Sequence, residues 1–148
     1  MVKVSYGKNI NSNRIKRIVE WFIDTMDLKN DTFKLRVIAS DSKKISKRHG
    51  KKYENNYGLA YTFGCRYYIE IKRSILACNE DLLYETVLEE LCHIYQYRKE
   101  GLKFNEETRK WSYENVDYPE DIPYDTMPWE INAKAWSKKL LKTYKQNL

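Results

Sequence analysis

The stretch from Asn79 to Gly101 constrains the fold of this chain more than any other. Its first residues, Asn79, Glu80 and Asp81, are typical of a helix start, and Gly101 is typical of a helix end. Apolar side chains recur between them at steps of three and four residues, at Leu83, Val87, Leu88, Leu91, Ile94 and Tyr95. This spacing predicts one long helix whose apolar stripe packs against a core.

Two further helices are expected, one before and one after this helix. The first follows the capping-type residues Asn11, Ser12 and Asn13, ends near Asp27, and has apolar positions at Ile15, Ile18, Val19, Phe22, Ile23 and Met26. In the last, Pro128 suits the first turn of a helix that runs from about Trp129 to Lys145. Its candidate packing residues are Ile131, Ala135, Leu140 and Leu141.

Three strands are predicted between the first two helices. Residues 33–39 alternate apolar and charged side chains, as a half-buried strand does. Residues 57–63 and 67–71 are aromatic and β-branched runs separated by three residues, which predicts an antiparallel hairpin. Residues 102–127 show no long clean period and are expected to form an irregular aromatic loop, with a short helix at 105–111 as an option. The fold class is therefore α+β, a small mixed or antiparallel sheet of about three strands packed against three main helices.

Composition favours a single folded domain over residues 1–148. The chain is 42% hydrophobic and 14% aromatic, which is too apolar and aromatic for a disordered protein. No apolar run approaches the roughly 18 residues of a membrane span, and residues 1–13 lack the apolar stretch of a secretory signal. We expect a cytoplasmic protein without membrane contact, in which Cys65, Cys78 and Cys92 stay reduced.

The net charge of +6 is concentrated in the first third of the chain. Residues 1–53 contain 14 Lys and Arg against 5 Asp and Glu, whereas residues 54–148 contain 13 against 16. The densest segment carries Lys43, Lys44, Lys47, Arg48, Lys51 and Lys52. Two interpretations stay open, a loop that binds nucleic-acid phosphates and a solvated basic loop without a partner. His49 lies in this segment and is expected to be exposed.

Chemistry-bearing residues gather in the long helix at Glu89, Glu90 and His93. Positions 89 and 93 are one turn apart, and Glu90 flanks the same helix face. A catalytic metal needs such a face, with ligands from successive turns and a carboxylate base beside the water that the metal activates. The pattern resembles the HExxH helix of metalloproteases with its first His replaced by Glu89. The adjacent Cys92 points about 100° away from His93 and is expected to be a packed thiol.

A third ligand is expected from Glu130 at the start of the last helix, because the small Ala133 that follows lets two helices approach closely. The last helix thus begins with the motif Pro128-Trp129-Glu130 followed by Ala133. Together with this motif, the order of strand, hairpin, ExxH-bearing helix, aromatic loop and last helix resembles that of the small zincin-like metallopeptidases of the SprT-like and ImmA/IrrE-like kind. Such proteins are often found in phages and mobile elements. The resemblance extends over most of residues 30–145, and only its two helix motifs are specific.

The resemblance implies a role for each motif residue. His93 matches the second His of HExxH, Glu90 the general base, and Glu130 the downstream metal ligand. Glu89 stands where the first His belongs, so that the ligands would be two carboxylates and one imidazole. Zinc accepts this set, and manganese or iron are alternatives because the added carboxylate is a hard ligand.

Two functions therefore remain as hypotheses. The first is a metal-dependent hydrolase, with a peptidase as the favoured class and a protein or peptide as substrate, in which Glu90 takes a proton from water. The second is a catalytically inactive zincin-like binding protein that holds a nucleic acid or a host protein through residues 43–52. Tyr118 or Tyr124, in the loop before Glu130, could donate to an oxyanion, but their spacing selects neither.

Overall fold

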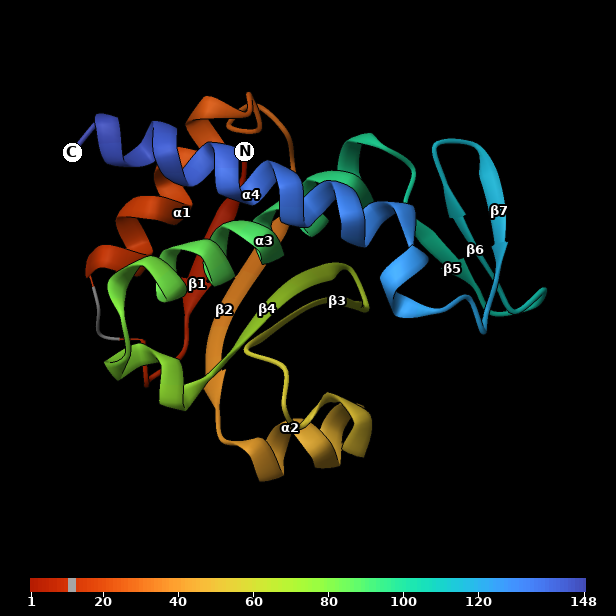
Figure 1. Ribbon diagram of the computed structural model, residues 1–148. Helices are drawn as coiled ribbons and strands as arrows, with labels where there is room; N and C mark the ends of the chain where they lie inside the picture. The colour runs from red at the N-terminus through yellow and green to blue at the C-terminus, as the bar shows by residue number, and fades with distance from the viewer. Residues whose placement is uncertain (11–12) are drawn as a thin grey trace.

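The computed structural model describes residues 1–10 and 13–148, which form an α+β fold (Figure 1). Its main sheet has four strands in the order β1-β2-β4-β3. These are β1 (Lys3–Tyr6), β2 (Lys34–Ser40), β4 (Arg66–Lys72) and β3 (Gly58–Phe63). β1, β2 and β4 are parallel, whereas β3 runs antiparallel to β4. The sheet is therefore mixed, with β3 at one edge.

The long helices α1 (Asn13–Thr25), α3 (Glu80–Lys99) and α4 (Pro128–Gln146) lie on one side of this sheet, and the short helix α2 (Ser42–His49) lies on the other (Figure 1). The sequence dictates this arrangement, because alternate residues of β2 such as Leu35 and Val37 are apolar and buried under the helices. The neighbouring Ile69 and Ile71 of β4 extend the same buried layer. The central α3 is buried on several faces and touches both the sheet and α4.

A second, smaller sheet joins α3 to α4. It is an antiparallel meander of β5 (Lys103–Asn105), β6 (Lys110–Tyr113) and β7 (Val116–Pro119). The turn between β6 and β7 places Glu114 and Asn115 at positive φ, as tight two-residue hairpins require. Rings of this sheet pack on Trp129, which lies in the first turn of α4. The meander thus supports the end of α4 that carries Glu130.

The predicted α+β class is confirmed, with four strands in the main sheet where about three were expected. The hairpin is confirmed as β3 and β4, the strand at 33–39 as β2, and the three long helices as α1, α3 and α4. Of the capping residues proposed for α1, Asn11 and Ser12 lie outside the described residues. The expected packing of Ile131 and Ala135 is wrong, because both side chains face solvent, whereas Leu140 is buried.

Three segments differ from the sequence-based expectation. Residues 42–49 are a helix and not a loop, because the Asp41 side chain caps it by accepting from the Lys44 N–H and Ile45 is buried beneath it. Residues 102–127 are not irregular, and 105–111 is a turn and strand instead of a helix. The strands β1 and β5–β7 are only three or four residues long, too short for a period to be recognised. Two short 3₁₀ segments, η1 (Lys51–Tyr53) and η2 (Arg73–Ala77), and a third before α4, η3 (Tyr124–Thr126), complete the connections.

Candidate active site

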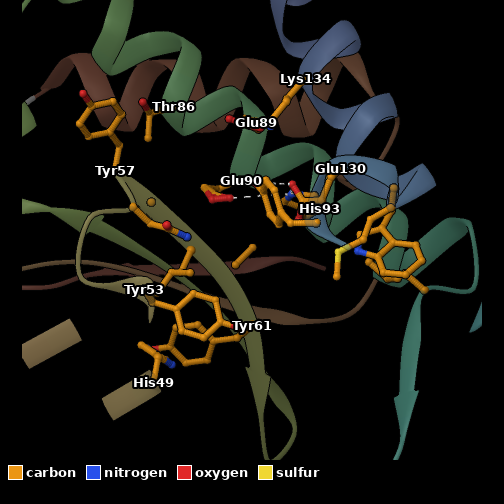
Figure 2. Close-up of a pocket in the computed structure, with 18 of the residues that line it drawn as sticks. His49, Tyr53, Tyr57, Tyr61, Thr86, Glu89, Glu90, His93, Glu130 and Lys134 are labelled. Carbon is orange, nitrogen blue, oxygen red and sulfur yellow. Dashed lines mark hydrogen bonds and ion pairs between the residues drawn. The ribbon is translucent and has the colours of Figure 1, made fainter. Parts of the chain in front are cut away.

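A cavity of about 620 Å³ lies between the edge strand β3, helix α3 and the start of α4 (Figure 2). Glu90 and His93 enter it from successive turns of α3, and Glu130 enters it from the first turn of α4. Figure 2 shows the side chains of Glu90 and Glu130 reaching His93 from these two helices. The structure therefore brings all four residues that the sequence singled out to one cavity, with Glu90 and Glu130 within 4.0 Å of His93 Nε2.

The ring of His93 is oriented by Gln96, three residues further along α3. The Gln96 Nε2 group donates to the backbone carbonyl of Trp129 at 2.8 Å, which turns its Oε1 toward His93. The distance between His93 Nδ1 and this Oε1 is 2.7 Å, and because an amide oxygen only accepts, Nδ1 must carry the hydrogen. His93 Nε2 therefore points into the cavity, and its lone pair is free for a ligand whenever the ring is neutral.

Two carboxylates face this nitrogen. Glu130 Oε2 lies 3.3 Å and Glu90 Oε1 4.0 Å from His93 Nε2. Burial alone lowers the pKa of His93, but the hydrogen bond with Glu130 and the charge of Glu90 outweigh it and raise the pKa to about 9. Burial raises the pKa of Glu130, but its hydrogen bonds with His93 and Tyr124 outweigh this effect and leave the Glu130 pKa lowered. Without a metal, His93 and Glu130 thus form an ion pair at neutral pH.

The pKa of Glu90, unlike that of Glu130, is determined mainly by burial. The side chain is almost fully enclosed beneath β3, and this raises its pKa to about 8 although the charge of His93 acts the other way. The backbone of Gly58 lies very near the Glu90 side chain. A Cβ added at position 58 would lie only 3.0 Å from Glu90 Cγ and from Thr86 Cγ2. Glu90 is therefore the proton-holding carboxylate of the cavity at neutral pH, and Glu130 is the ionised one.

Glu89 lines the same cavity but makes no ion pair with His93 in the described part of the chain. Partial burial and the charge of Glu130 raise its pKa, while His93 and Lys134 oppose this shift. Among residues 1–10 and 13–148, no group of three or more His, Cys, Asp or Glu side chains is placed to hold a metal ion. The ligand role of Glu89 stays a prediction.

The donors that do meet fit a divalent metal in chemistry and in spacing. Two ligands of a tetrahedral zinc ion, each about 2.0–2.2 Å from the metal, lie roughly 3.3–3.5 Å apart. The separation of His93 Nε2 and Glu130 Oε2 is 3.3 Å. The tautomer of His93 is also the one that a metal needs, with its other nitrogen donating to a fixed acceptor. These two residues are thus suited to be the first ligands, and a carboxylate from α3 would complete the set.

Tyr124 is the tyrosine of the 102–127 segment that reaches the site. Its hydroxyl donates to Glu130 Oε2 at 2.9 Å, and the Lys134 ammonium lies 4.7 Å from the centre of its ring. Burial, together with the nearby Glu130 carboxylate, raises the Tyr124 pKa well above its ordinary value, so the hydroxyl keeps its proton. Tyr118 instead packs its ring against Trp129. Sequence spacing did not select between them, because neither the strand β7 that places Tyr118 nor the 3₁₀ segment η3 that places Tyr124 was recognised.

Three residues that line one end of the cavity, Arg48, His49 and Tyr61, converge on Glu70 of β4, whose side chain is fully buried. Arg48 Nη1 lies 2.5 Å from Glu70 Oε2, His49 Nε2 lies 2.8 Å from Glu70 Oε1, and the Tyr61 hydroxyl donates to the same Oε1 at 3.0 Å. Burial raises the pKa of Glu70, but these hydrogen bonds and one from Ser40 leave it lowered. The expectation that His49 is an exposed loop residue is wrong, because its side chain is only 15% exposed and holds α2 against the sheet.

Sequence reasoning missed Gln96 and Glu70. Gln96 follows His93 at the i+3 spacing that allows side chains to meet on a helix, which was an available signal. Glu70 alternates with buried Ile69 and Ile71 in a strand, and nothing nearby in the sequence marks its partners. Cys92 is buried as predicted, and burial raises its thiol pKa, which makes it a poor nucleophile.

Comparison with known proteins adds no relative: no family model, curated protein or solved structure matches this chain. Within the described residues, no helix is long and apolar enough to cross a membrane. The likeness to zincin-like metallopeptidases therefore rests on the two helix motifs of the sequence.

Proposed function

We propose that this chain is a metal-dependent hydrolase whose active site is the cavity around His93, with peptides as its substrate class. The observation that carries the proposal is the setting of His93. Its Nδ1 is committed to Gln96, and its Nε2 faces Glu130 at 3.3 Å and Glu90 at 4.0 Å. A buried histidine that serves only packing has no need of two carboxylates at one nitrogen. His93 and Glu130, with Glu89 as the predicted third ligand, would hold zinc, or manganese or iron.

Different residues around this site have different roles in the proposed hydrolysis. When bound, a divalent ion supplies Lewis-acid activation of water and of a carbonyl group. In the metal-free protein burial keeps Glu90 protonated, but a nearby cation favours its ionised form, which would take the proton from the attacking water and return it to the leaving amine. Tyr124 keeps its proton and donates it in a hydrogen bond to Glu130 Oε2 at 2.9 Å, which holds that carboxylate in place beside His93.

An extended peptide is the favoured substrate because the cavity runs along a sheet edge. β3 is the outer strand of the main sheet, and its residues Gly58 to Tyr61 line the cavity beside Glu90 and His93. The backbone groups on the outer side of an edge strand can pair with a peptide added as a further strand. Such pairing would lay a scissile amide across the mouth of the site without requiring a particular side chain.

Metal content tests the first step of the proposal. Purified protein, dialysed at neutral pH against trace zinc, manganese or iron, should retain close to one equivalent of one metal in elemental analysis. Glu130→Gln should lose this metal, and Glu89→His should tighten its binding by restoring an imidazole. Glu85→Gln, one turn before Glu89 on α3, is the matched control and should bind as the unmodified chain does. If none of the three metals is retained by the unmodified protein, or if Glu130→Gln retains as much metal as the unmodified protein, the proposed metal site is wrong.

Hydrolysis tests the second step. A library of unstructured peptides, incubated with the metal-loaded protein and analysed by mass spectrometry, should be cleaved, and a chelator should stop cleavage. Glu90→Gln should lower the rate by about 10²- to 10⁴-fold while the bound metal is retained, because it removes general-base catalysis. Full activity of Glu90→Gln would show that the base is another group.

A second candidate function is nucleic-acid binding through residues 43–52, and one observation favours it. In the part of the chain that the structure describes, Lys43, Lys44, Lys47, Lys51 and Lys52 are all exposed and belong to none of the ion pairs. Their charges are therefore available to phosphates. Replacing Lys43, Lys44 and Lys47 by Ala should weaken binding to DNA or RNA at low salt, and unchanged binding would reduce the segment to a solvated surface.

A further inference from the structure

The face of the main sheet turned away from α1, α3 and α4 has a composition unlike the rest of the molecule. Pairing across the four strands places the same alternate positions on this face. These positions are Lys3, Ser5, Lys34, Arg36, Ile38, Ser40, Arg66, Tyr68, Glu70, Lys72, Leu59, Tyr61 and Phe63. We call this set the open face, because Lys3, Ser5, Lys34 and Phe63 are exposed on it, whereas α2 contacts it at Glu70 and Tyr61.

Cations are aligned across the open face in a way that costs stability. Lys3 of β1 is directly opposite Lys34 of β2, and Lys34 is directly opposite Arg66 of β4. Like charges that face each other on neighbouring strands repel. Among the described residues, none of these three side chains belongs to an ion pair, and Glu70, the one acidic residue of the open face, is already paired with Arg48. An external anion is the natural partner for such a row.

Aromatic rings continue these rows toward the edge of the sheet. Phe63 of β3 is paired with Arg66, and Phe63 is 76% exposed. A polar residue would be equally compatible with this position at a hairpin end, so packing does not explain the exposed ring. In the next row, Arg36 is followed by Tyr68 and Tyr61, whose rings are parallel with centroids 5.2 Å apart. Each row thus contains a cation that can hold a phosphate and a ring on which a planar base can stack.

From this arrangement we propose that the open face binds single-stranded nucleic acid. Aromatic residues on adjacent strands, flanked by cations, match the alternation of bases and phosphates in a strand whose bases are unstacked. A duplex fits less well, because its bases are already stacked inside and its phosphates alone would meet the sheet. The basic helix α2 borders the open face, since its residue His49 contacts the Tyr61 ring at a centroid distance of 4.5 Å. It would extend the cationic track beyond the strands.

This binding function does not require the proposed hydrolysis, although Leu59 and Tyr61 also line the cavity of that site, and a metal-free protein tests it. Fluorescence anisotropy with labelled oligo(dT) of about 20 nucleotides should show saturable binding that weakens steeply as salt rises. A duplex of the same length and a base-free polyphosphate should bind more weakly. Phe63→Ala should weaken oligo(dT) binding about tenfold, and Phe63→Leu should fail to restore it, because leucine keeps apolar bulk without a π face. Phe63→Trp should retain it.

Charge variants separate the open face from general basicity. Lys34→Gln should lower the slope of log affinity against log salt by about 0.7, the contribution of one phosphate contact on a single strand. Lys138→Gln, on the exposed surface of α4, changes the net charge equally and should leave the slope unchanged. Equal binding of oligo(dT) and polyphosphate together with no effect of Phe63→Ala, or binding only to an acidic polypeptide such as polyglutamate, would overturn the proposal.

Discussion

Gln96 joins the two helices of the candidate site, because its side-chain amide donates to the backbone carbonyl of Trp129 at 2.8 Å. Trp129 immediately precedes Glu130, so the same amide that orients His93 also fixes the start of α4. Gln96 is fully buried, and both of its polar atoms are used. The distance between His93 and Glu130 therefore depends on a residue that is not among those that line the cavity.

Replacing Gln96 with leucine should destabilise the protein and loosen the site. The variant leaves the Trp129 carbonyl and His93 Nδ1 without partners in a buried setting, which we expect to lower the free energy of unfolding by about 3 kcal/mol. Urea denaturation followed by circular dichroism measures this. Gln146→Leu, at the exposed end of α4, is the control and should change stability by less than about 0.5 kcal/mol. Equal effects of the two substitutions would show that the Gln96 bridge contributes nothing.

The metal-free protein should lose stability as the pH rises from 4.5 to about 8. Burial raises the Glu90 pKa from 4.5 to about 8, so the folded state keeps a proton that the unfolded chain releases. The stabilisation is complete below pH 4.5 and is lost as pH rises through 8. Glu90→Gln removes the titrating group and should gain at least about 1 kcal/mol relative to the unmodified protein between pH 5 and 8.5. Thermal denaturation at both values measures it.

Glu85→Gln is the control for this pH dependence, since it removes a carboxylate from the same helix. Its stability should follow that of the unmodified protein at both pH values. The rise of the His93 pKa to about 9 adds a further loss between pH 6.5 and 9, because the ion pair with Glu130 disappears when the ring becomes neutral. A Glu90→Gln protein that lost as much stability as the unmodified chain between pH 5 and 8.5 would contradict the assignment.

Acid should break a second ion pair, which fixes the loop before β2 to α3. Arg98 donates from Nη2 to Asp31 Oδ1 at 2.6 Å and from Nε to Asp31 Oδ2 at 3.0 Å, and these bonds lower the Asp31 pKa to about 2. A lowered carboxyl pKa stabilises the fold above pH 3.8, and this contribution is lost as pH falls through 2. Asp31→Asn should therefore cost about 1–2 kcal/mol at pH 7 and almost nothing at pH 2. Asp121→Asn, at an exposed position, should cost little at either pH.

Local patterns in the sequence predicted the parts of the site that lie on one helix. Glu90 and His93 share a face of α3 because their spacing matches the helical repeat, and the apolar stripe around them made the helix recognisable. Glu130 was found through its motif at a helix start, and it does lie against His93. The i+3 spacing of Gln96 from His93 was a local signal that was overlooked, whereas the Gln96–Trp129 and Glu70–Arg48 contacts join residues 33 and 22 positions apart and leave no local signal.

The open face escaped notice for a related reason. Its cations are ordinary surface residues when the strands are considered one at a time, and only the pairing of β1, β2 and β4 aligns Lys3, Lys34 and Arg66. Strand order cannot be derived from alternation, and β1 was too short to be predicted at all. The charge-rich segment at 43–52, which is continuous in sequence, was visible, whereas the charge cluster assembled by the sheet was not.

The contact between Gly58 and the Glu90–Thr86 pair should control access to the general base. A Cβ at position 58 would meet Thr86 Cγ2 and Glu90 Cγ, both at 3.0 Å, so Gly58→Ala forces β3 away from α3 or moves the Glu90 side chain. We expect a loss of about 1–3 kcal/mol in the free energy of unfolding, as in other overpacked sites. Thr86→Ser removes the Cγ2 methyl while keeping the hydroxyl that donates to the Leu82 carbonyl. Gly58→Ala should therefore cost less in the Thr86→Ser background, and a double-mutant cycle measures this coupling. Additive losses would mean that the two elements are not in contact at this point.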